Sequence, residues 1–274
     1  MRARIEVLGF TVTDTPDGSR VERPTPAPLR RIAAAEVRFT SERTGGISVQ
    51  WLADGWPEDV RRGIDSFRRR GGADQQHVVV DTMSGDPDPS SWPGDVELVA
   101  LEPSTGWAAA RNAGLRRATG SIVLVVDGSV EATGDPFPAL ARALQDESIG
   151  IAGPFGLVTR DLREFEESGG PDVDAIEAYV MAFRRDVLEQ VGGFDERFAF
   201  YRSADLELSF RAKDRGYRAV VVPDVPAERH EHRRWTTTPV EERDRLSKRN
   251  FNRFVERFRG RFDLCVAPRA PDRS

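Results

Sequence analysis

The sequence contains very little cysteine and histidine. Its single cysteine, Cys265 among 274 residues, excludes an intramolecular disulfide framework and provides no metal-binding spacing. A lone thiol is typical of proteins in a reducing compartment. Two of the three histidines, His230 and His232, lie in one short segment. Any histidine-containing metal site would therefore have to involve this segment.

Long apolar runs are also absent. The longest uninterrupted aliphatic run covers residues 122–126, whereas a membrane-spanning helix needs about 20 apolar residues. The sequence Met1-Arg2-Ala3-Arg4 leads into no apolar signal-peptide core. We therefore expect a soluble, cytoplasmic protein that contacts the cytoplasmic membrane face at most peripherally.

Net charge is small. A formal charge of −5 gives no general reason to expect nucleic-acid binding, and we predict none. Residues 229–261 nevertheless contain eleven Lys or Arg against five Asp or Glu, which suits phosphate groups. With 39% hydrophobic residues, the chain can bury a full core.

Apolar runs and helical patterns alternate after Gly46. Residues 1–45 differ: a predicted strand at 4–13, a turn at Pro16-Asp17-Gly18 and a proline-rich spacer indicate a small β-rich appendage. The following segments are predicted as strands at 47–52, 77–81, 96–101 and 122–127, and as helices at 57–70 and 106–118. Such apolar strands favour an open α/β architecture, Rossmann-like, with a mainly parallel sheet flanked by helices. Its ligand should lie beyond the carboxyl ends of the strands.

Aspartates stand at the ends of two of these predicted strands and at the start of a later predicted helix. Asp81 and Asp127 each end a predicted strand, although an Asp there is also a common turn former. Gly192-Gly193 permits a tight turn that a side chain would block. Asp205 then opens an amphipathic helix, where a carboxylate serves either as a general base or as a helix cap.

Several motifs in succession resemble those of family 2 glycosyltransferases, which have the GT-A fold of nucleotide-diphospho-sugar transferases. The resemblance covers residues 46 to 235 and rests on these segments: Val80-Asp81-Thr82-Met83-Ser84, Gly106-Trp107-Ala108-Ala109-Ala110-Arg111-Asn112-Ala113-Gly114, Val126-Asp127-Gly128-Ser129, Gly192-Gly193-Phe194-Asp195-Glu196 and Ala204-Asp205-Leu206-Glu207-Leu208-Ser209-Phe210-Arg211. There are three departures from the family's pattern. Ser129 replaces the second acid of the usual Asp-x-Asp motif, Ala204 replaces the first acid of an acidic pair, and Trp51-Leu52-Ala53-Asp54 lacks the Pro and Asn that are common after the first strand.

The resemblance implies an inverting hexosyltransferase that uses a nucleoside-diphosphate sugar such as a UDP-sugar. Its acceptor would be a glycan, a lipid-linked molecule or a small molecule. Asp205 would be the general base. Donor binding would involve Asp81, Ser84, Arg111, Asn112 and Asp127, and acceptor or sugar binding would involve Gly193, Asp195 and Arg211. The alternative is a non-catalytic protein of the same fold that binds a nucleotide or a glycan.

A divalent cation, Mn²⁺ or Mg²⁺, is the cofactor that the resemblance implies. Its candidate ligands are Asp127, Ser129, His230 and His232. Two alternatives remain: the histidines belong to a polar loop, or nearby arginines at 229, 233 and 234 bind the diphosphate directly through bidentate hydrogen bonds.

The resemblance also divides the chain. Residues 46–240 form the predicted glycosyltransferase domain, with a nucleotide-sugar half at 46–149 and an acceptor half at 150–240. Residues 241–274 form a C-terminal helix and tail. Its apolar stripe, Phe251, Phe254, Val255, Phe258 and Phe262, either packs on the domain or contacts a membrane.

Overall fold

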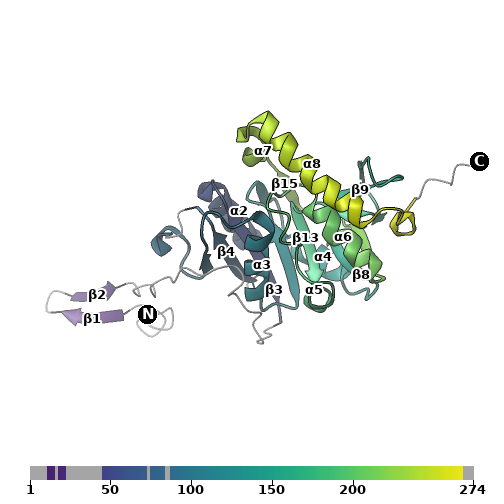
Figure 1. The fold of residues 1–274 in the computed structure, drawn as a ribbon. Coiled ribbons are helices and arrows are strands. Elements are labelled where there is room, and N and C mark those ends of the chain that lie inside the picture. Colours follow the sequence, from purple (N-terminus) through teal and green to yellow (C-terminus); the bar gives the residue numbers. More distant parts are fainter. Residues whose placement is uncertain (1–10, 16–17, 23–44, 73–74, 84–86, 268–274) are drawn as a thin grey trace, which may run out of the picture.

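An eight-stranded mixed sheet forms the centre of the molecule (Figure 1). The computed structural model describes residues 11–15, 18–22, 45–72, 75–83 and 87–267. In sheet order the strands are β11 (Asp172–Val173), β14 (Arg218–Val221), β8 (Ile149–Gly153), β13 (Val180–Arg184), β6 (Ile122–Val126), β3 (Ile47–Ala53), β4 (Gln75–Asp81) and β5 (Glu97–Ala100). Strands β6, β3, β4 and β5 are mutually parallel, as are β8 and β14. Only β13 and β11 run in the opposite direction, so the predicted mainly parallel sheet is confirmed.

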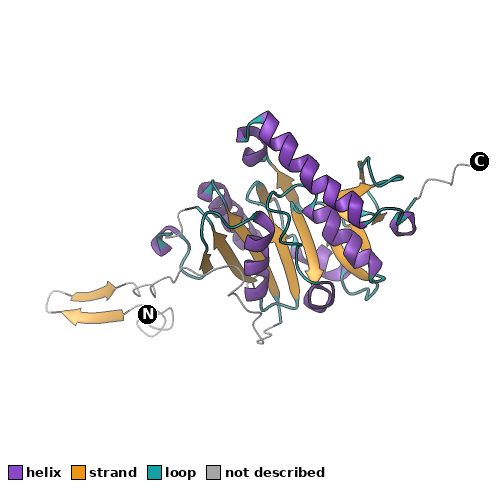
Figure 2. Cartoon of the chain, in the orientation of Figure 1, coloured by secondary structure: helices purple, strands orange, loops and turns teal. Residues whose placement is uncertain are grey.

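Helices cover both faces of this sheet (Figure 2). On one face α2 (Pro57–Arg70) and α4 (Phe137–Ala143) pack against the strands. On the other face lie α3 (Trp107–Arg117), α5 (Arg185–Val191) and α6 (Ala204–Asp214). In α2 the buried residues Val60, Ile64 and Phe67 recur at helical spacing. The strands are buried on both sides, which explains their unbroken apolar runs.

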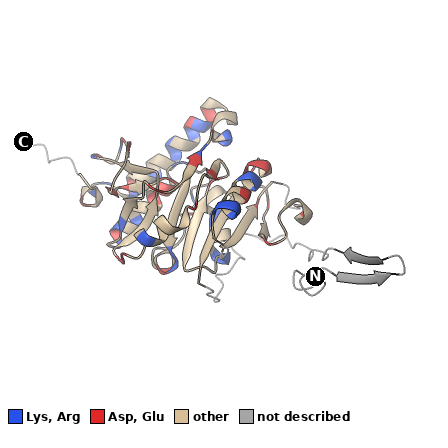
Figure 3. Cartoon of the chain, turned by 180° about the vertical axis from the view of Figure 1, so that it is seen from behind, with Lys and Arg blue, Asp and Glu red and all other residues tan. Residues whose placement is uncertain are grey.

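The last long helix, α8 (Val240–Arg257), packs on α6. Phe254 and Phe258 are buried, and both rings lie about 5 Å from the ring of Phe210 on α6 (5.0 and 5.3 Å). The apolar stripe thus packs on the domain as far as Phe258, whereas Phe262 in the 3₁₀ turn η3 (Phe262–Leu264) is 42% exposed. Acidic and basic residues alternate on the helices (Figure 3). No helix among the described residues is long and apolar enough to cross a membrane.

Short elements complete the fold around the carboxyl ends of the central strands. A small antiparallel sheet contains β10 (Glu166–Ser168), β9 (Gly156–Val158) and β12 (Ala175–Ile176). A second pair joins β7 (Val130–Ala132) to β15 (Ala227–Arg229), and the chain continues into the short helix α7 (Arg233–Thr237). The 3₁₀ turn η2 (Pro89–Ser91) precedes β5.

The N-terminal segment contains an antiparallel hairpin of β1 (Thr11–Thr15) and β2 (Gly18–Glu22). The predicted strand at 4–13 is thus described only in its last three residues. Residues 4–10, the turn residues Pro16 and Asp17, and the spacer at 24–28 lie outside the described residues.

Candidate functional site

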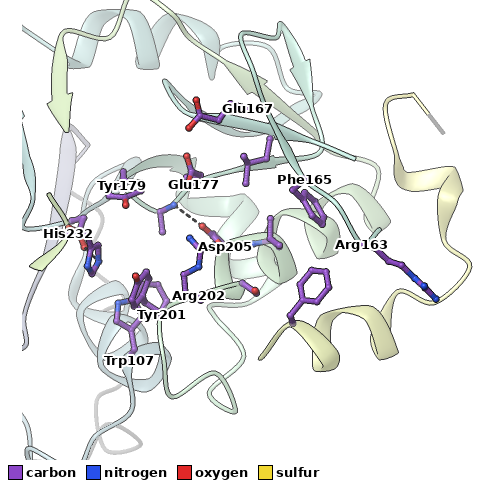
Figure 4. A pocket seen from close by; sticks show the side chains of 16 residues that line it. Trp107, Arg163, Phe165, Glu167, Glu177, Tyr179, Tyr201, Arg202, Asp205 and His232 are labelled. Carbon is purple, nitrogen blue, oxygen red and sulfur yellow. Dashed lines mark hydrogen bonds and ion pairs between the residues drawn. The ribbon is translucent and has the colours of Figure 1, made fainter. Parts of the chain in front are cut away.

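A pocket of about 430 Å³ opens beside the carboxyl end of β6 (Figure 4). Its walls come from seven places in the chain: the end of β6, the start of α3, the region of β9 and β10, the segment between β12 and β13, the start of α6 with the residues before it, the residue before α7, and α8. The polar and aromatic lining consists of Asp127, Glu167, Glu177, Asp205, Arg163, Arg202, Ser203, His232, Trp107, Phe165, Tyr179, Tyr201 and Phe251. The pocket thus combines carboxylates with aromatic faces, a lining suited to a polyhydroxylated ligand.

Asp205 lies in this pocket at the second position of α6. Its Oδ1 accepts a hydrogen bond from the Leu206 N–H (2.9 Å), and its Oδ2 accepts one from the Ala178 N–H (3.3 Å). Burial raises the pKa of Asp205 above its ordinary value, although the charge of Arg202 and the backbone donors oppose the shift. A carboxylate with a raised pKa, held in a pocket, is suited to accept a proton near neutral pH.

The residue that precedes α6 has an unusual backbone conformation. Ser203 has a φ of 66°, in the left-handed region that a residue with a β-carbon seldom adopts. Its side chain makes no capping hydrogen bond to the helix. Because Ser203 also lines the pocket, this backbone turn sets the direction in which the first turn of α6 presents Asp205.

Asp127 lies on another wall of the same pocket. It follows β6, and the antiparallel pairing of Val180 with Val126 places Tyr179 beside it, with the Asp127 N–H donating to the Tyr179 carbonyl (3.0 Å). Asp127 Oδ2 lies 3.4 Å from His232 Nε2 and 3.8 Å from Arg111 Nη2. Burial alone would raise the pKa of Asp127, but His232, Arg111 and the Ser129 hydroxyl together lower it. Asp127 is therefore ionised at neutral pH.

His232 connects Asp127 to the aromatic wall. Its ring stacks on Tyr201 at 4.2 Å between ring centroids, and Tyr179 meets it edge-on at 6.0 Å. Burial would lower the pKa of His232, but the hydrogen bond and charge of Asp127 raise it overall. Its Nδ1 is buried and has no hydrogen-bond partner among the described residues, whereas its Nε2 faces Asp127.

The other candidate metal ligands are arranged differently. The Ser129 hydroxyl donates to Asp127 Oδ1 (2.6 Å). His230 Nε2 lies 3.1 Å from Glu131 Oε1, so the two histidines contact different carboxylates. No group of three or more His, Cys, Asp or Glu residues in the described part of the chain is arranged to hold a metal ion. Asp127 and His232 are thus the two candidate ligands that face each other in the pocket.

Arg111 is buried beneath Asp127 and does not line the pocket. Its Nη1 donates to Gln50 Oε1 (2.8 Å) and to the Val126 carbonyl (3.1 Å), and its guanidinium lies 5.2 Å from the Trp107 ring. Burial lowers the pKa of Arg111 to about 10, so the group stays charged at neutral pH. It supplies positive charge under Asp127 from within the protein.

The tight glycine turn is held by two of the predicted site residues. Gly192 has a φ of 85°, and a β-carbon on Gly193 would lie 2.2 Å from Asn112 Oδ1. The buried Asn112 amide accepts from the Phe194 N–H (2.7 Å) and donates to the Phe194 carbonyl (2.8 Å). Arg211 donates to the Val191 and Gly193 carbonyls (2.6 and 2.5 Å). The turn therefore requires glycine for conformation and for space.

Asp195 and Asp81 lie away from the pocket lining. Asp195 forms an ion pair with Arg197 (2.6 Å), whose hydrogen bonds lower the pKa of Asp195. Asp81 is fully buried at the end of β4, and its Oδ1 accepts from the Met83 N–H (2.9 Å). Its Oδ2 has no partner among the described residues, and burial raises the pKa of Asp81. Ser84 lies outside the described residues.

The three arginines considered for diphosphate binding already have acidic partners. Arg229 contacts Glu177 (3.2 Å) and Glu167 (3.5 Å). Arg233 contacts Glu58 and Asp59 (2.9 and 3.1 Å), and Arg234 contacts Asp54. By contrast, Arg202 lines the pocket and forms no ion pair within the described part of the chain.

Sequence reasoning missed several residues of this pocket, above all Glu177, Tyr179, Tyr201 and Arg202. Glu177 and Tyr179 precede β13, a strand that the sequence analysis did not predict. A signal was available, because residues 180–183 are uniformly apolar. An additional strand beside β6 would have brought its flanking residues to Asp127.

A family model matches part of this chain. The family model described as glycosyl transferase family 2 matches residues 57–192, a range that includes Asp81 and Asp127 and ends before Asp205. No curated protein gives a match.

Solved structures show the fold. A structure of GalNAc-T7 with UDP, GalNAc and Mn²⁺ matches with a TM-score of 0.62 at 17% identity, covering 77% of this chain and 48% of that chain. The mannosyltransferase PcManGT from Pyrobaculum calidifontis, in complex with GDP-Man and Mn²⁺, matches with a TM-score of 0.51 at 22% identity, covering 76% of this chain and 61% of that chain. S. aureus TarS matches with a TM-score of 0.52 at 16% identity, covering 77% of this chain and 43% of that chain. The chain thus has a GT-A fold and spans about half the length of GalNAc-T7.

Proposed function

Because the chain belongs to glycosyl transferase family 2, we propose that it moves a sugar from a nucleoside-diphosphate donor to an acceptor hydroxyl with inversion of the anomeric centre. One observation carries this proposal. Asp127 and Asp205, from separate elements, line a single pocket beside the carboxyl end of β6, the region where open α/β sheets bind ligands.

In the proposed reaction Asp205 is the general base. It takes the proton of the acceptor hydroxyl while that oxygen forms a bond to the anomeric carbon. The bond between the anomeric carbon and the phosphate oxygen breaks, and the nucleoside diphosphate leaves from the opposite face. The raised pKa of Asp205 supports this role, since a stronger base accepts the proton more readily. The rings of Tyr179 and Tyr201 would shield the reacting atoms from water.

Asp127 and His232 would bind the diphosphate end of the donor. Carboxylate and imidazole suit Mn²⁺, which is present in the structures of GalNAc-T7 and PcManGT. A bound cation would neutralise the charge that the leaving diphosphate gains. The Ser129 hydroxyl holds the Asp127 carboxylate through Oδ1 and leaves Oδ2 to face His232 Nε2, so these two atoms could share a ligand.

The remaining predicted residues take supporting roles in this proposal. Arg111 stabilises the charge of Asp127 from below. Asp81, whose Oδ2 has no partner among the described residues, would bind the nucleoside together with Ser84. We assign Asn112 and Arg211 to the glycine turn at Gly193. Asp195, fixed by Arg197 at the same turn, would orient a sugar hydroxyl from its edge.

The test is a panel of UDP-, GDP- and dTDP-sugars incubated with the protein, Mn²⁺ and simple glycoside acceptors. We expect release of nucleoside diphosphate from one donor class and, by proton NMR of the initial product, an anomeric configuration opposite to that of the donor. Retention of configuration would contradict the proposed mechanism. If the protein binds a donor but transfers its sugar neither to any acceptor nor to water, the non-catalytic alternative would be indicated instead.

A further inference from the structure

Two carboxyl groups from different elements face the same pocket. Glu177 follows β12, and Asp205 belongs to α6. They are closely linked, because the N–H of Ala178, the residue after Glu177, donates to Asp205 Oδ2 (3.3 Å). Figure 4 shows both side chains at the pocket, with Asp205 at one end of this hydrogen bond. A ligand that fills the pocket would therefore meet both carboxyl groups.

Glu177 is held in place by one oxygen only. Its Oε2 accepts from Arg229 Nη1 (3.2 Å). The Arg229 guanidinium is itself fixed, since it lies over the rings of Phe155 (4.9 Å) and Tyr179 (4.6 Å) and also contacts Glu167 (3.5 Å). The other oxygen, Oε1 of Glu177, receives no hydrogen bond from the described residues. An oriented carboxyl group thus presents an unused oxygen to the pocket.

The surroundings of Glu177 favour recognition of a neutral polar group. Its side chain is 14% exposed, so an incoming group would displace little water. Burial, reinforced by the charge of Asp205, raises the pKa of Glu177 to about 7. Near neutral pH the group can then either accept or donate a hydrogen bond, as the partner requires. A hydroxyl group is the ligand that can meet both forms.

We propose that Glu177 binds a second hydroxyl of the acceptor, adjacent to the hydroxyl that Asp205 activates. The protein would then select acceptors that carry neighbouring hydroxyl groups, such as a sugar ring. This inference rests on the proposed glycosyltransferase function. It makes Glu177 a specificity-determining residue, because a site built to bind a hydroxyl strongly rejects analogues that lack it.

The test compares Glu177→Gln with Glu166→Gln. Glu166 is exposed on β10 and does not line the pocket, which makes it the control for the loss of one carboxylate. The assays are transfer to methyl glucoside, galactoside and mannoside with their monodeoxy analogues, and donor hydrolysis by water. For Glu177→Gln we expect kcat/KM for the best glycoside to fall about 10- to 100-fold, mainly through KM, as one charge-assisted hydrogen bond is lost.

We further expect Glu177→Gln to leave donor hydrolysis within about twofold, since water offers no second hydroxyl. It should also reduce the preference for the parent glycoside over the deoxy analogue. Glu166→Gln should change neither rate. Equal losses of hydrolysis and transfer would overturn the inference, because they would indicate a role in the reaction itself or in folding. Unchanged transfer would overturn it as well.

A binding experiment separates this inference from the proposed function. If the wild-type protein cleaves no sugar nucleotide, the proposed function fails, but glycoside binding can still be followed by saturation-transfer NMR. Ring-proton signals of a methyl glycoside that weaken in Glu177→Gln and persist in Glu166→Gln would support binding of a second hydroxyl group by Glu177. Equal signals in both variants, or none with the wild-type protein, would contradict it. Circular dichroism checks that each variant is folded.

Discussion

Replacing Asn112 with alanine separates two interpretations of a residue that the sequence analysis assigned to donor binding. Its buried amide forms two hydrogen bonds to the backbone of Phe194, at 2.7 and 2.8 Å. Removing the amide leaves the Phe194 N–H and C=O without partners. Each buried polar group left unsatisfied costs about 1–3 kcal/mol, so the unfolding free energy should fall by about 3 kcal/mol.

For a chain of this size, 3 kcal/mol corresponds to a melting temperature lower by about 6–12 °C. The assay is urea and thermal denaturation followed by circular dichroism. Asn252→Ala is the control, because Asn252 is exposed on α8. Donor affinity, measured on folded protein, should change little. A loss of unfolding free energy below about 0.5 kcal/mol, together with a large loss of donor affinity, would show that Asn112 does not stabilise the backbone at Phe194. The donor-binding interpretation would then hold.

Three further predictions concern packing, pH and metal. Phe254→Ala should lower the unfolding free energy by about 3–5 kcal/mol, because Phe254 is buried between α8 and α6, whereas the exposed Phe262→Ala should have little effect; urea denaturation measures both. The raised pKa of Glu177 means that its folded form holds a proton more tightly than its unfolded form. Relative to Glu177→Gln, the wild-type protein should therefore lose up to about 3 kcal/mol of stability as pH rises from 4.5 to about 7; stability that increased over this range would contradict the shift. EDTA should abolish transfer and lower donor affinity, and Asp127→Asn should make donor binding insensitive to EDTA. Calorimetric titration measures the affinity. Donor binding by the wild-type protein that does not change with EDTA would argue against the cation.

Local patterns predicted the elements between residues 46 and 127 well. The helix predicted at 57–70 coincides with α2, and the strands at 47–52 and 122–127 correspond to β3 and β6 within one residue. These elements are specified by contiguous apolar runs and by helical spacing near a proline start. The position of Asp127 followed from the same reasoning, because an acid after a buried parallel strand lies at the ligand-binding edge.

The second half of the pocket depends on pairings between distant segments. Strand β13 inserts antiparallel between β6 and β8, and its register with Val126 brings Tyr179 to Asp127. A run of apolar residues does not reveal its neighbours in the sheet. The position of Glu177 beside Asp205 depends on the same insertion, so it could not be predicted from the sequence.

The two histidines illustrate the same limit on a smaller scale. In an extended segment His230 and His232 would lie on the same side, because side chains alternate along a strand. In the structure β15 ends at Arg229 and α7 begins at Arg233. The histidines therefore occupy a turn, where strand alternation does not apply, and they contact Glu131 and Asp127 respectively.

The central claim is that Asp205 removes the acceptor proton. The most direct measurement is single-turnover transfer by Asp205→Asn, compared with the wild-type protein and with Asp244→Asn, an exposed control on α8. Calorimetric donor titration accompanies it. The account predicts a transfer rate lower by about 10²- to 10⁴-fold for Asp205→Asn, with donor affinity nearly unchanged. Transfer at a rate close to that of the wild-type protein would contradict the assignment of Asp205 as the base.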